Sequence, residues 1–367
     1  MNRILVFGMT ENPGGVESFL VNYYRHINRD KIQFDFLCNS YNDVAYEQEL
    51  IEMGARMFHI TARSENLKKY KKELKNLFTE HYKEWKAIWV NVCSLANIDY
   101  LKLAKKYGIR KRIIHSHNSQ NMDNKLRGIL HNINKKNITK YATDFWACSD
   151  DAAKWFYNEL KNVVIIRNAI DVEKLSFDID KRKKIRKNMG FNDSFIVGNV
   201  GRLHFQKNQK FVLDIFAEVI KRIPSAKLVL IGQGEDEAKL KERCKQLKIE
   251  ENVLFMGIQK NIDEWLSAFD VFLFPSLFEG LSIAALEAQA SGIPVLASAN
   301  VISKEAKLNE NFKFYSLDNT ARDWAKQLLY LRENCKREAK KCVMQNFMQS
   351  GYEINTEVKK LEKLLME

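Results

Sequence analysis

Two glutamates beyond the end of a predicted strand are the residues best placed to do chemistry. Val271–Phe274 is an unbroken apolar run that predicts a buried strand, and a helix is expected over about Leu281–Ala290. Glu279 falls in the loop between them, and Glu287 follows about two helical turns along the same side. Carboxylates so placed can accept hydrogen bonds from the hydroxyls of one extended ligand, whereas two glutamates on a solvated helix face are the ordinary alternative.

Two cations follow the end of another predicted strand. Phe195–Val200 predicts the strand, Gly201 allows a tight turn, and Arg202 and Lys207 come before the next helix. Ligands bind at the carboxyl ends of the strands in open parallel sheets, so these cations should face the same crevice as Glu279. They could neutralise a diphosphate leaving group without a metal ion. Ordinary surface basic residues are the alternative.

Helix starts and glycine turns offer further places for an anion. The helix that begins near Gly280, Leu281 and Ser282 presents free N–H groups and a partial positive charge. In the first half of the chain, Gly14 and Gly15 separate the first strand from the first helix and would let a backbone approach a phosphate or a sugar. A plain turn explains the glycine pair equally well.

Two histidines end a strand in the first half of the chain. His115 and His117 lie in the run RIIHSHNSQ, followed by Asn118. Alternate residues of a strand share a face, but at its final turn one can point inward and the other toward a ligand. A lone histidine is more often structural, whereas two with an asparagine at a strand terminus favour a functional role. The strand pattern leaves open whether His115 or His117 has that role.

The run FEGLSIAALEAQASGIPVLAS resembles the signature of retaining glycosyltransferases of the GT-B fold, the large family four, with EG at Glu279 and EA at Glu287. GRLHFQKNQ is similar to the Gly-Arg and Lys pattern of the same family. The resemblance covers nearly the whole chain and is nearest to bacterial capsular and exopolysaccharide transferases. It implies that Glu287 binds the ribose of a nucleotide and that Glu279 contacts the donor sugar. It also implies that His117, or as second choice His115, touches this sugar near its anomeric carbon.

The resemblance also implies the remaining contacts of the donor. The diphosphate-binding residues would be Arg202, Lys207, Gly14, Gly15, Gly280, Leu281 and Ser282. The backbone after Gly257, around Ile258 and Gln259, would hold the base. Ser149 and Asn168 match further family positions with less weight. No metal ion and no cofactor are expected, because the nucleotide sugar is a substrate.

Apolar strand-like runs alternate with amphipathic helices along the whole chain, which predicts an α/β protein with parallel sheets covered on both faces. Two such sets predict two Rossmann-like domains facing across a deep cleft, with a break near Arg167–Arg182. The resemblance assigns residues 1–170 to acceptor binding and 171–350 to nucleotide-sugar binding. Residues 351–367 are expected to form an amphipathic helix that could cap either domain, and the resemblance implies that it crosses back to the first domain. The predicted strands are Ile4–Phe7, Phe34–Cys38, Ile88–Val92, Arg112–His115, Asp144–Cys148, Val163–Ile166, Phe195–Val200, Lys227–Ile231, Val253–Met256, Val271–Phe274 and Pro294–Ala297.

The composition limits the classes of partner and the cellular location that we expect. A net charge of +13 and a pI near 9.2 call for nucleic acid, an anionic membrane or phosphorylated substrates, and no zinc finger or RNP motif supports nucleic acid. No apolar run reaches the roughly 18 residues of a spanning helix, and no signal peptide is visible. The six cysteines form no CxxC pair and are expected to be reduced. We therefore expect a cytoplasmic protein, peripherally associated with the inner face of the membrane.

Three segments have patterns that allow more than one structural or functional interpretation. Asn124–Lys136 has apolar residues at helical spacing among basic ones, so it is either a core-facing helix or an interfacial helix that docks on anionic lipid. Asp178–Asp180 matches a metal-binding DxD motif but lies in a charged stretch, which favours a solvated linker. Gly232-Gln233-Gly234 lacks the third glycine of a dinucleotide fingerprint.

Together these features predict a retaining glycosyltransferase. It would move a hexose or N-acetylhexosamine from a nucleoside-diphosphate sugar, expected to be a UDP-sugar, to a lipid-linked saccharide in the synthesis of a capsule or exopolysaccharide. A nucleotide-sugar epimerase of the same fold and a catalytically silent partner subunit are the alternatives. The sequence does not specify the sugar, the base, the acceptor or the oligomeric state.

Overall fold

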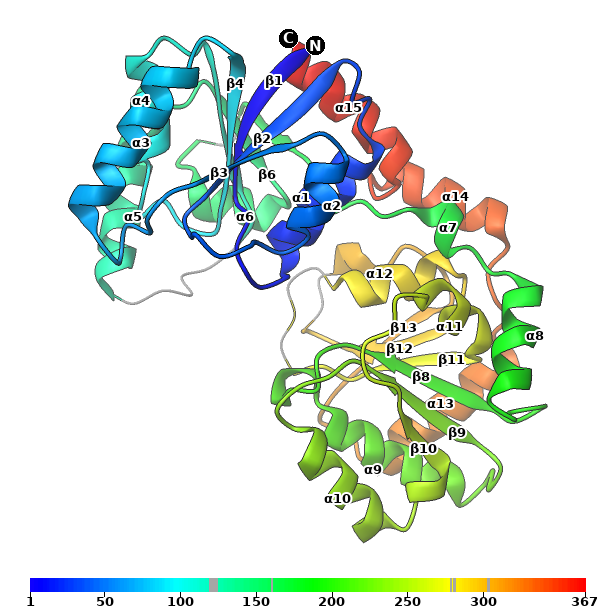
Figure 1. Ribbon diagram of the computed structural model, residues 1–367. Helices are drawn as coiled ribbons and strands as arrows, with labels where there is room; N and C mark the ends of the chain where they lie inside the picture. The colour runs from blue at the N-terminus through cyan, green and yellow to red at the C-terminus, as the bar shows by residue number, and fades with distance from the viewer. Residues whose placement is uncertain (119–124, 160, 278, 280–281, 302–303) are drawn as a thin grey trace. The chain divides into compact units, whose positions relative to one another are not determined.

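The computed structural model describes residues 1–118, 125–159, 161–277, 279, 282–301 and 304–367. Two compact units make up the chain (Figure 1). Unit 1 consists of Met1–Ala169 together with Ile354–Glu367, and unit 2 consists of Ile170–Glu353. Each unit is an α/β layer structure around its own parallel sheet.

Unit 1 contains, within the described ranges, a seven-stranded parallel sheet in the order β3-β2-β1-β4-β5-β6-β7. Its strands are β1 Asn2–Phe7, β2 Ile32–Cys38, β3 Arg56–His59, β4 Trp85–Val92, β5 Lys111–Ser116, β6 Asp144–Ala147 and β7 Val163–Ile165. Its helices are α1 Gly15–His26, α2 Glu47–Glu52, α3 Leu67–His81, α4 Asp99–Lys106, α5 Lys125–Asn137, α6 Asp150–Phe156 and α15 Ile354–Met366.

Both faces of this sheet are buried because the strands are apolar on both sides. Ile4 and Val6 of β1 pack with α1 and α15, whereas Leu5 packs with α3 and α4 on the other face. All three side chains are fully buried. Strands of this kind need helices on both faces, which alternating strands and helices supply.

Unit 2 contains, in the part of the chain that the structure describes, a six-stranded parallel sheet in the order β10-β9-β8-β11-β12-β13. Its strands are β8 Ile196–Val200, β9 Lys227–Ile231, β10 Val253–Phe255, β11 Val271–Phe274, β12 Val295–Ser298 and β13 Phe312–Tyr315. Its helices are α7 Val172–Leu175, α8 Ile179–Asn188, α9 Gln209–Ile220, α10 Glu237–Leu247, α11 Ile262–Ala268, α12 Ile283–Ala290, α13 Ala321–Asn334 and α14 Lys340–Gln349.

Two features differ from the sequence prediction. The strands β3 and β13 were missed, and each lies at an edge of its sheet with few fully buried residues, so neither has the continuous apolar run of a central strand. The stretch Arg167–Arg182 was predicted to be a linker but contains α7 and the start of α8. Asp178 caps α8 by accepting hydrogen bonds from the N–H groups of Asp180 and Lys181.

Candidate functional site

A buried ion pair lies at the carboxyl edge of the unit 2 sheet. Lys207 follows β8 in a short 3₁₀ turn, Phe205–Lys207, and its Nζ lies 2.6 Å from Oε1 of Glu279, which follows β11. The side chains are only 20% and 6% exposed, and the ammonium lies 5.2 Å from the ring centre of Phe274. Two of the predicted site residues therefore meet, although they are 72 positions apart in the sequence.

Asn208 holds this pair in place, and the sequence analysis missed it. Its backbone is left-handed, with φ of 58°, a conformation that asparagine tolerates better than most residues. Its Nδ2 donates a hydrogen bond of 3.0 Å to the carbonyl of Pro275, and Leu277 donates one of 2.8 Å to the carbonyl of Gln206. These bonds join the loop after β8 to the loop after β11. The asparagine directly after Lys207 was the feature of the sequence that could have indicated this contact.

Arg202 lies apart from this pair in the structure. Its guanidinium is 68% exposed and binds Oε2 of Glu235 at 3.0 Å, and His204 lies 3.3 Å from the other oxygen of that carboxylate. The loops after β8 and β9 therefore present one cation that is already held by an acidic partner. The structure thus brings Lys207 and Glu279 together but not Arg202.

The glycines of the Gly232-Gln233-Gly234 turn allow these two loops to touch. A Cβ on Gly232 would lie 2.0 Å from the carbonyl oxygen of Gly201, and one on Gly234 would lie 2.3 Å from that of Leu203. Gly201 donates a hydrogen bond of 2.9 Å to the carbonyl of Ile231. The turn is a packing feature that fixes the loop bearing Arg202 and Lys207.

Glu287 has a different environment from Glu279. It lies on α12, which Ser282 caps by accepting a hydrogen bond from the N–H of Ala285. Burial raises the pKa of Glu287 to about 7, and Lys174 of α7 partly opposes this rise. Within the described ranges, its carboxylate has no hydrogen bond or ion pair to another side chain. The predicted contacts Gly280 and Leu281 lie outside the described residues.

The predicted base-binding segment follows β10. Ile258 is 66% exposed, whereas Gln259 is tied down by a hydrogen bond to the carbonyl of Met256 at 2.6 Å and one from the indole of Trp265 at 3.3 Å. The carbonyl of Gly257 accepts a hydrogen bond of 2.8 Å from Gly232. This loop is therefore joined to the loop after β9, beside the turn described above.

The structure separates the two histidines of unit 1. His115 is fully buried against the rings of Phe19, Trp89 and Trp146. His117 is partly exposed, and its Nε2 lies 2.9 Å from Oδ1 of Asn91, so this nitrogen carries the proton. Burial lowers the pKa of His117 to about 3, so its ring is neutral. Only His117 is accessible to a ligand.

A cavity of about 760 Å³ opens at the carboxyl edge of the unit 1 sheet. Gly8, Asn91 and Gly15 line it, as do Arg63 and side chains of α5. A Cβ on Gly15 would meet no atom within 4 Å, whereas one on Gly14 would lie 2.8 Å from the Glu17 carboxylate. Neither backbone requires glycine. Gly15 thus leaves open space at the start of α1.

Two buried polar residues at this edge were missed by the sequence analysis. Asn91 is 2% exposed and holds His117, and Glu17 is 6% exposed and accepts a hydrogen bond of 2.6 Å from the hydroxyl of Thr10. An asparagine inside the apolar run of β4 was a readable signal for the first. The lower-weight candidates differ: Ser149 caps α6, and Oδ1 of Asn168 is buried without a hydrogen-bond partner among the described residues.

The helix α5 has an apolar stripe that is exposed to solvent. Leu126, Ile129, Leu130 and Ile133 are between 42% and 74% exposed, so the core-facing alternative does not hold for them. His131 alone is assigned to the buried face of this helix. Lys135 is turned inward, where it donates hydrogen bonds to the carbonyls of Lys154 and Trp155.

The described residues contain neither a metal-binding cluster nor a membrane-spanning helix. No three His, Cys, Asp or Glu side chains in these ranges are grouped so that they could hold a metal ion. None of the described helices is long and apolar enough to cross a membrane. The six cysteines are all free thiols, of which Cys38 and Cys244 are buried.

Comparisons with known proteins agree with this arrangement. Residues 180–343 match the family model for glycosyl transferases group 1. The putative glycosyltransferase EpsF of Bacillus subtilis (strain 168) is 30% identical over 306 residues, which cover 80% of this chain and 78% of EpsF. An Escherichia coli UDP-Gal:α-D-GlcNAc-diphosphoundecaprenol α-1,3-galactosyltransferase is 34% identical over 149 residues, or 40% of this chain and 38% of that one.

Solved structures share the fold. HepE of Anabaena in complex with UDP superposes with a TM-score of 0.80 at 17% identity, over 100% of both chains. The lipopolysaccharide glycosyltransferase WaaG gives 0.67 at 13% identity, over 99% of both chains. The fold is therefore GT-B, and the chain belongs to the group 1 glycosyltransferases.

Proposed function

We propose that this protein is a retaining, metal-independent glycosyltransferase that moves a hexose or N-acetylhexosamine from a UDP-sugar to a lipid-linked saccharide during the synthesis of a cell-surface polysaccharide. The donor would bind unit 2 and the acceptor unit 1. The observation that carries the proposal is the buried pair of Lys207 and Glu279 at the carboxyl edge of the unit 2 sheet. Membership of the group 1 glycosyltransferases supports the reaction class.

Lys207 is suited to stabilise a departing diphosphate. One of its three N–H groups is directed to Glu279, and the other two are left for phosphate oxygens. Negative charge grows on the diphosphate as the glycosidic bond breaks, so a fixed ammonium in a partly buried site lowers the transition state more than the ground state. Arg202 would add a second cation after leaving Glu235.

The two glutamates would hold the sugar and the ribose. Glu279 is fixed by Lys207 and can accept a hydrogen bond from a hydroxyl of the donor sugar. Glu287, whose carboxylate has no hydrogen-bond or ion-pair partner among the described residues, can accept hydrogen bonds from the ribose. HepE has been crystallised with UDP and with UDP-glucose, which supports UDP as the carrier. Neutral His117 would contact the sugar, and the acceptor hydroxyl would attack from the leaving-group side.

Replacing Lys207 with alanine tests the leaving-group role. We expect the turnover number for transfer to fall by about 100-fold or more, because mutations of comparable electrostatic groups have costs of this size. The matched control is Lys210→Ala, an exposed lysine on α9. Transfer within about threefold of the unaltered protein would remove Lys207 from this role. Conversion of the UDP-sugar without an acceptor would instead identify an epimerase, and addition of EDTA tests metal independence.

The acceptor proposal rests on α5 and the cavity of unit 1. Arg127 and Leu130 of α5 line this cavity together with Arg63, so cations suited to phosphate lie beside an exposed apolar stripe. A lipid-linked saccharide phosphate has the same two parts. The name of the Escherichia coli relative includes an undecaprenol-diphosphate acceptor, which supports this class. Docking of α5 on an anionic lipid surface would place the protein at the inner face of the membrane.

Replacing Ile129 and Ile133 with serine tests the docking. We expect co-flotation with phosphatidylglycerol vesicles to fall at least fivefold, since each exposed isoleucine contributes about 1.5 kcal/mol or more when it is buried. Replacing the exposed apolar residues Ile51 and Met348, which lie outside α5, is the control. Equal binding by both double variants would show that α5 is not the anchor. Transfer to a water-soluble acceptor should remain unchanged in both.

A further inference from the structure

One face of α8 lines a broad hollow in unit 2, which we name the α8 hollow. Its volume is about 1100 Å³. The residues on this face of α8 are almost all cationic. Two arginines join them, one in the last turn of α13 and one just beyond its end. The cationic lining residues are Arg182, Lys183, Arg186, Lys187, Arg332 and Arg337.

The α8 hollow lies at the opposite sheet edge from the proposed donor site. It is lined by Phe195, Asp270 and Pro294, which come directly before β8, β11 and β12. Lys207 and Glu279 come after β8 and β11. Since a strand of five residues at about 3.3 Å per residue separates the two edges, they are roughly 15 Å apart. The hollow is therefore not part of the donor site.

Among the described residues, the lysines of α8 form close ion pairs on one side of the helix only. Toward α11, Lys181 pairs with Asp263 at 2.6 Å and Lys184 pairs with Glu264 at 2.9 Å. Toward the hollow, Lys183 comes no nearer than 4.0 Å to Asp180. For Lys187, no ion pair is formed with any carboxylate in the described ranges.

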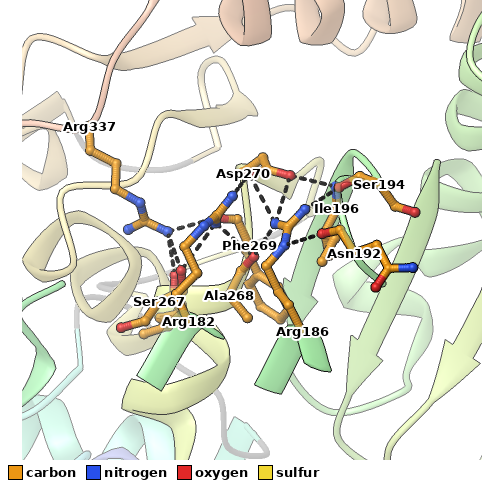
Figure 2. A network of polar contacts seen from close by, with 11 residues as sticks. Arg182, Arg186, Asn192, Ser194, Ile196, Ser267, Ala268, Phe269, Asp270 and Arg337 are labelled. Atoms are coloured by element: carbon orange, nitrogen blue, oxygen red, sulfur yellow. Dashed lines mark hydrogen bonds and ion pairs between the residues drawn. The ribbon is translucent and has the colours of Figure 1, made fainter. Parts of the chain in front are cut away.

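A single carboxylate serves two arginines at the base of the hollow (Figure 2). Asp270 binds the guanidinium of Arg182 at 2.6 Å and that of Arg186 at 3.3 Å, and it also accepts a hydrogen bond from the N–H of Ile196. The remaining N–H groups of Arg182 and Arg186 donate mainly to backbone carbonyls, which carry no formal charge. Two guanidinium charges therefore face one carboxylate charge, so Arg182, Arg186 and Asp270 together carry a net charge of +1.

Arg337 adds to this excess. It donates hydrogen bonds to the carbonyls of Ser291, Leu266 and Phe269, and none of its hydrogen bonds is to a carboxylate in the described part of the chain. Burial, followed by repulsion from Arg182, lowers the pKa of Arg337 to about 9. Arg332 stacks on the ring of Phe195 without an acidic partner among the described residues. In all, six cationic side chains line the hollow against two carboxylates, Asp193 and Asp270.

We propose that the α8 hollow is a second anion site, which binds a ligand that carries a phosphate group. Lys183 and Lys187, which are exposed, and Arg332 would contact the phosphate oxygens, while the network around Asp270 fixes the floor. Guanidinium and ammonium groups bind phosphate through short charge-assisted hydrogen bonds. The source of the phosphate is either a free metabolite or the headgroup of an anionic phospholipid.

The test is a calorimetric titration of the full chain with inorganic pyrophosphate while UDP saturates the donor site. The variant Lys183→Gln/Lys187→Gln should bind pyrophosphate at least about tenfold more weakly, because each charged hydrogen bond contributes substantially to affinity. The control Lys241→Gln/Lys245→Gln removes the same charge from α10, outside the hollow, and should bind as the unaltered protein does. UDP affinity and transfer should be unchanged in both variants, so this site can fail without affecting the proposed reaction.

A second arm identifies the source of the phosphate. Both variants are floated with vesicles of phosphatidylglycerol and with vesicles of phosphatidylcholine. If Lys183→Gln/Lys187→Gln loses pyrophosphate binding but floats normally, the ligand is a free phosphate compound. If it loses pyrophosphate binding and also floats less with phosphatidylglycerol vesicles, the ligand is a headgroup. If the two variants behave alike with pyrophosphate and with vesicles, the proposal is overturned.

Discussion

The two glutamates of the candidate donor site show how environment separates residues of the same type. Glu279 is 6% exposed and pairs with Lys207, so its negative charge is balanced inside the protein. Glu287 has no such partner among the described residues, and burial raises its pKa to about 7. A carboxylate kept without a partner is costly for folding and is well suited to accept hydroxyl groups of a ligand. If Glu287 binds the donor as proposed, stability and donor binding make opposite demands on it.

Replacing Glu287 with glutamine should stabilise the protein at alkaline pH. Its carboxyl has a pKa of about 7 in the folded state against 4.5 ordinarily, so the folded state binds more protons between these values and loses stability as the pH rises from 4.5 to 7. The variant removes this penalty, and at pH 8 the free energy of unfolding should rise by up to about 3 kcal/mol. Thermal unfolding at pH 8 and at pH 5 measures the effect.

The gain should be much smaller at pH 5, where the carboxyl of the folded protein is already protonated. Affinity for a UDP-sugar should increase from pH 6 to pH 8 in the unaltered protein, because the ionised carboxylate accepts the ribose hydroxyls better, and this dependence should disappear in the variant. A gain in stability that is equal at both pH values would contradict the assigned pKa.

At the scale of elements, the loops after β8 and β9 are held together by glycine contacts. Gly232 has a φ of +136° and lies against the carbonyl of Gly201, and both strands are central in the unit 2 sheet. The loop that begins at Gly201 leads to Lys207. Any displacement of this contact should therefore reach the ion pair with Glu279.

Gly232→Ala should destabilise unit 2 and weaken binding of UDP. The new Cβ would lie 2.0 Å from the oxygen of Gly201, and overpacking of this kind costs about 1–3 kcal/mol. Gly257→Ala is the matched control, because Gly257 also has positive φ, at +61°, but no atom lies within 4 Å of its Cβ position. It should cost about 1 kcal/mol and leave the β8 loop in place. Urea unfolding and UDP titration compare the two, and equal effects would show that the contact with Gly201 is unimportant.

At the scale of the whole molecule, the chain passes from unit 1 into unit 2 and then returns to unit 1. Residues Ile170–Glu353 form unit 2, whereas the last helix, α15, belongs to unit 1, where it packs against α1. Ile354, Val358, Leu361 and Leu365 of α15 are buried in the same core as β1 and β2. Glu362 accepts a hydrogen bond of 2.6 Å from the N–H of Asn28. The last helix is thus a structural part of the first unit.

Leu361→Ala should lower the stability of unit 1 and leave that of unit 2 nearly unchanged. Leu361 is fully buried, and truncating a buried leucine to alanine costs about 2–5 kcal/mol. The partly buried Leu364 is the control, and its replacement by alanine should have a smaller effect. Calorimetry resolves the two units if they melt separately, and UDP identifies unit 2 by raising its transition temperature. A downward shift confined to the UDP-sensitive transition would contradict this assignment.

Much of the architecture could be predicted from the sequence because the central strands are buried on both faces. Such strands are continuous apolar runs, as Val271–Phe274 shows, and they are legible without tertiary information. The edge strands β3 and β13 have half-buried residues such as Arg56 and Tyr315, so their pattern resembles that of a loop. The helix α5 was ambiguous because spacing alone shows that a stripe is apolar but not what covers it.

The features of the candidate site also fall into two groups, those that the sequence predicts and those that depend on tertiary packing. The residue types of Glu279, Lys207 and Glu287, together with their places after strands, were readable from the sequence because parallel strands bring their carboxyl ends to one edge. The direction of each side chain was not readable, since Arg202 and Lys207 lie five positions apart but bind Glu235 and Glu279 respectively. Tertiary packing alone determined that His115 is enclosed by aromatic rings while His117 is held by Asn91, because ring contacts and burial depend on residues far apart in the chain.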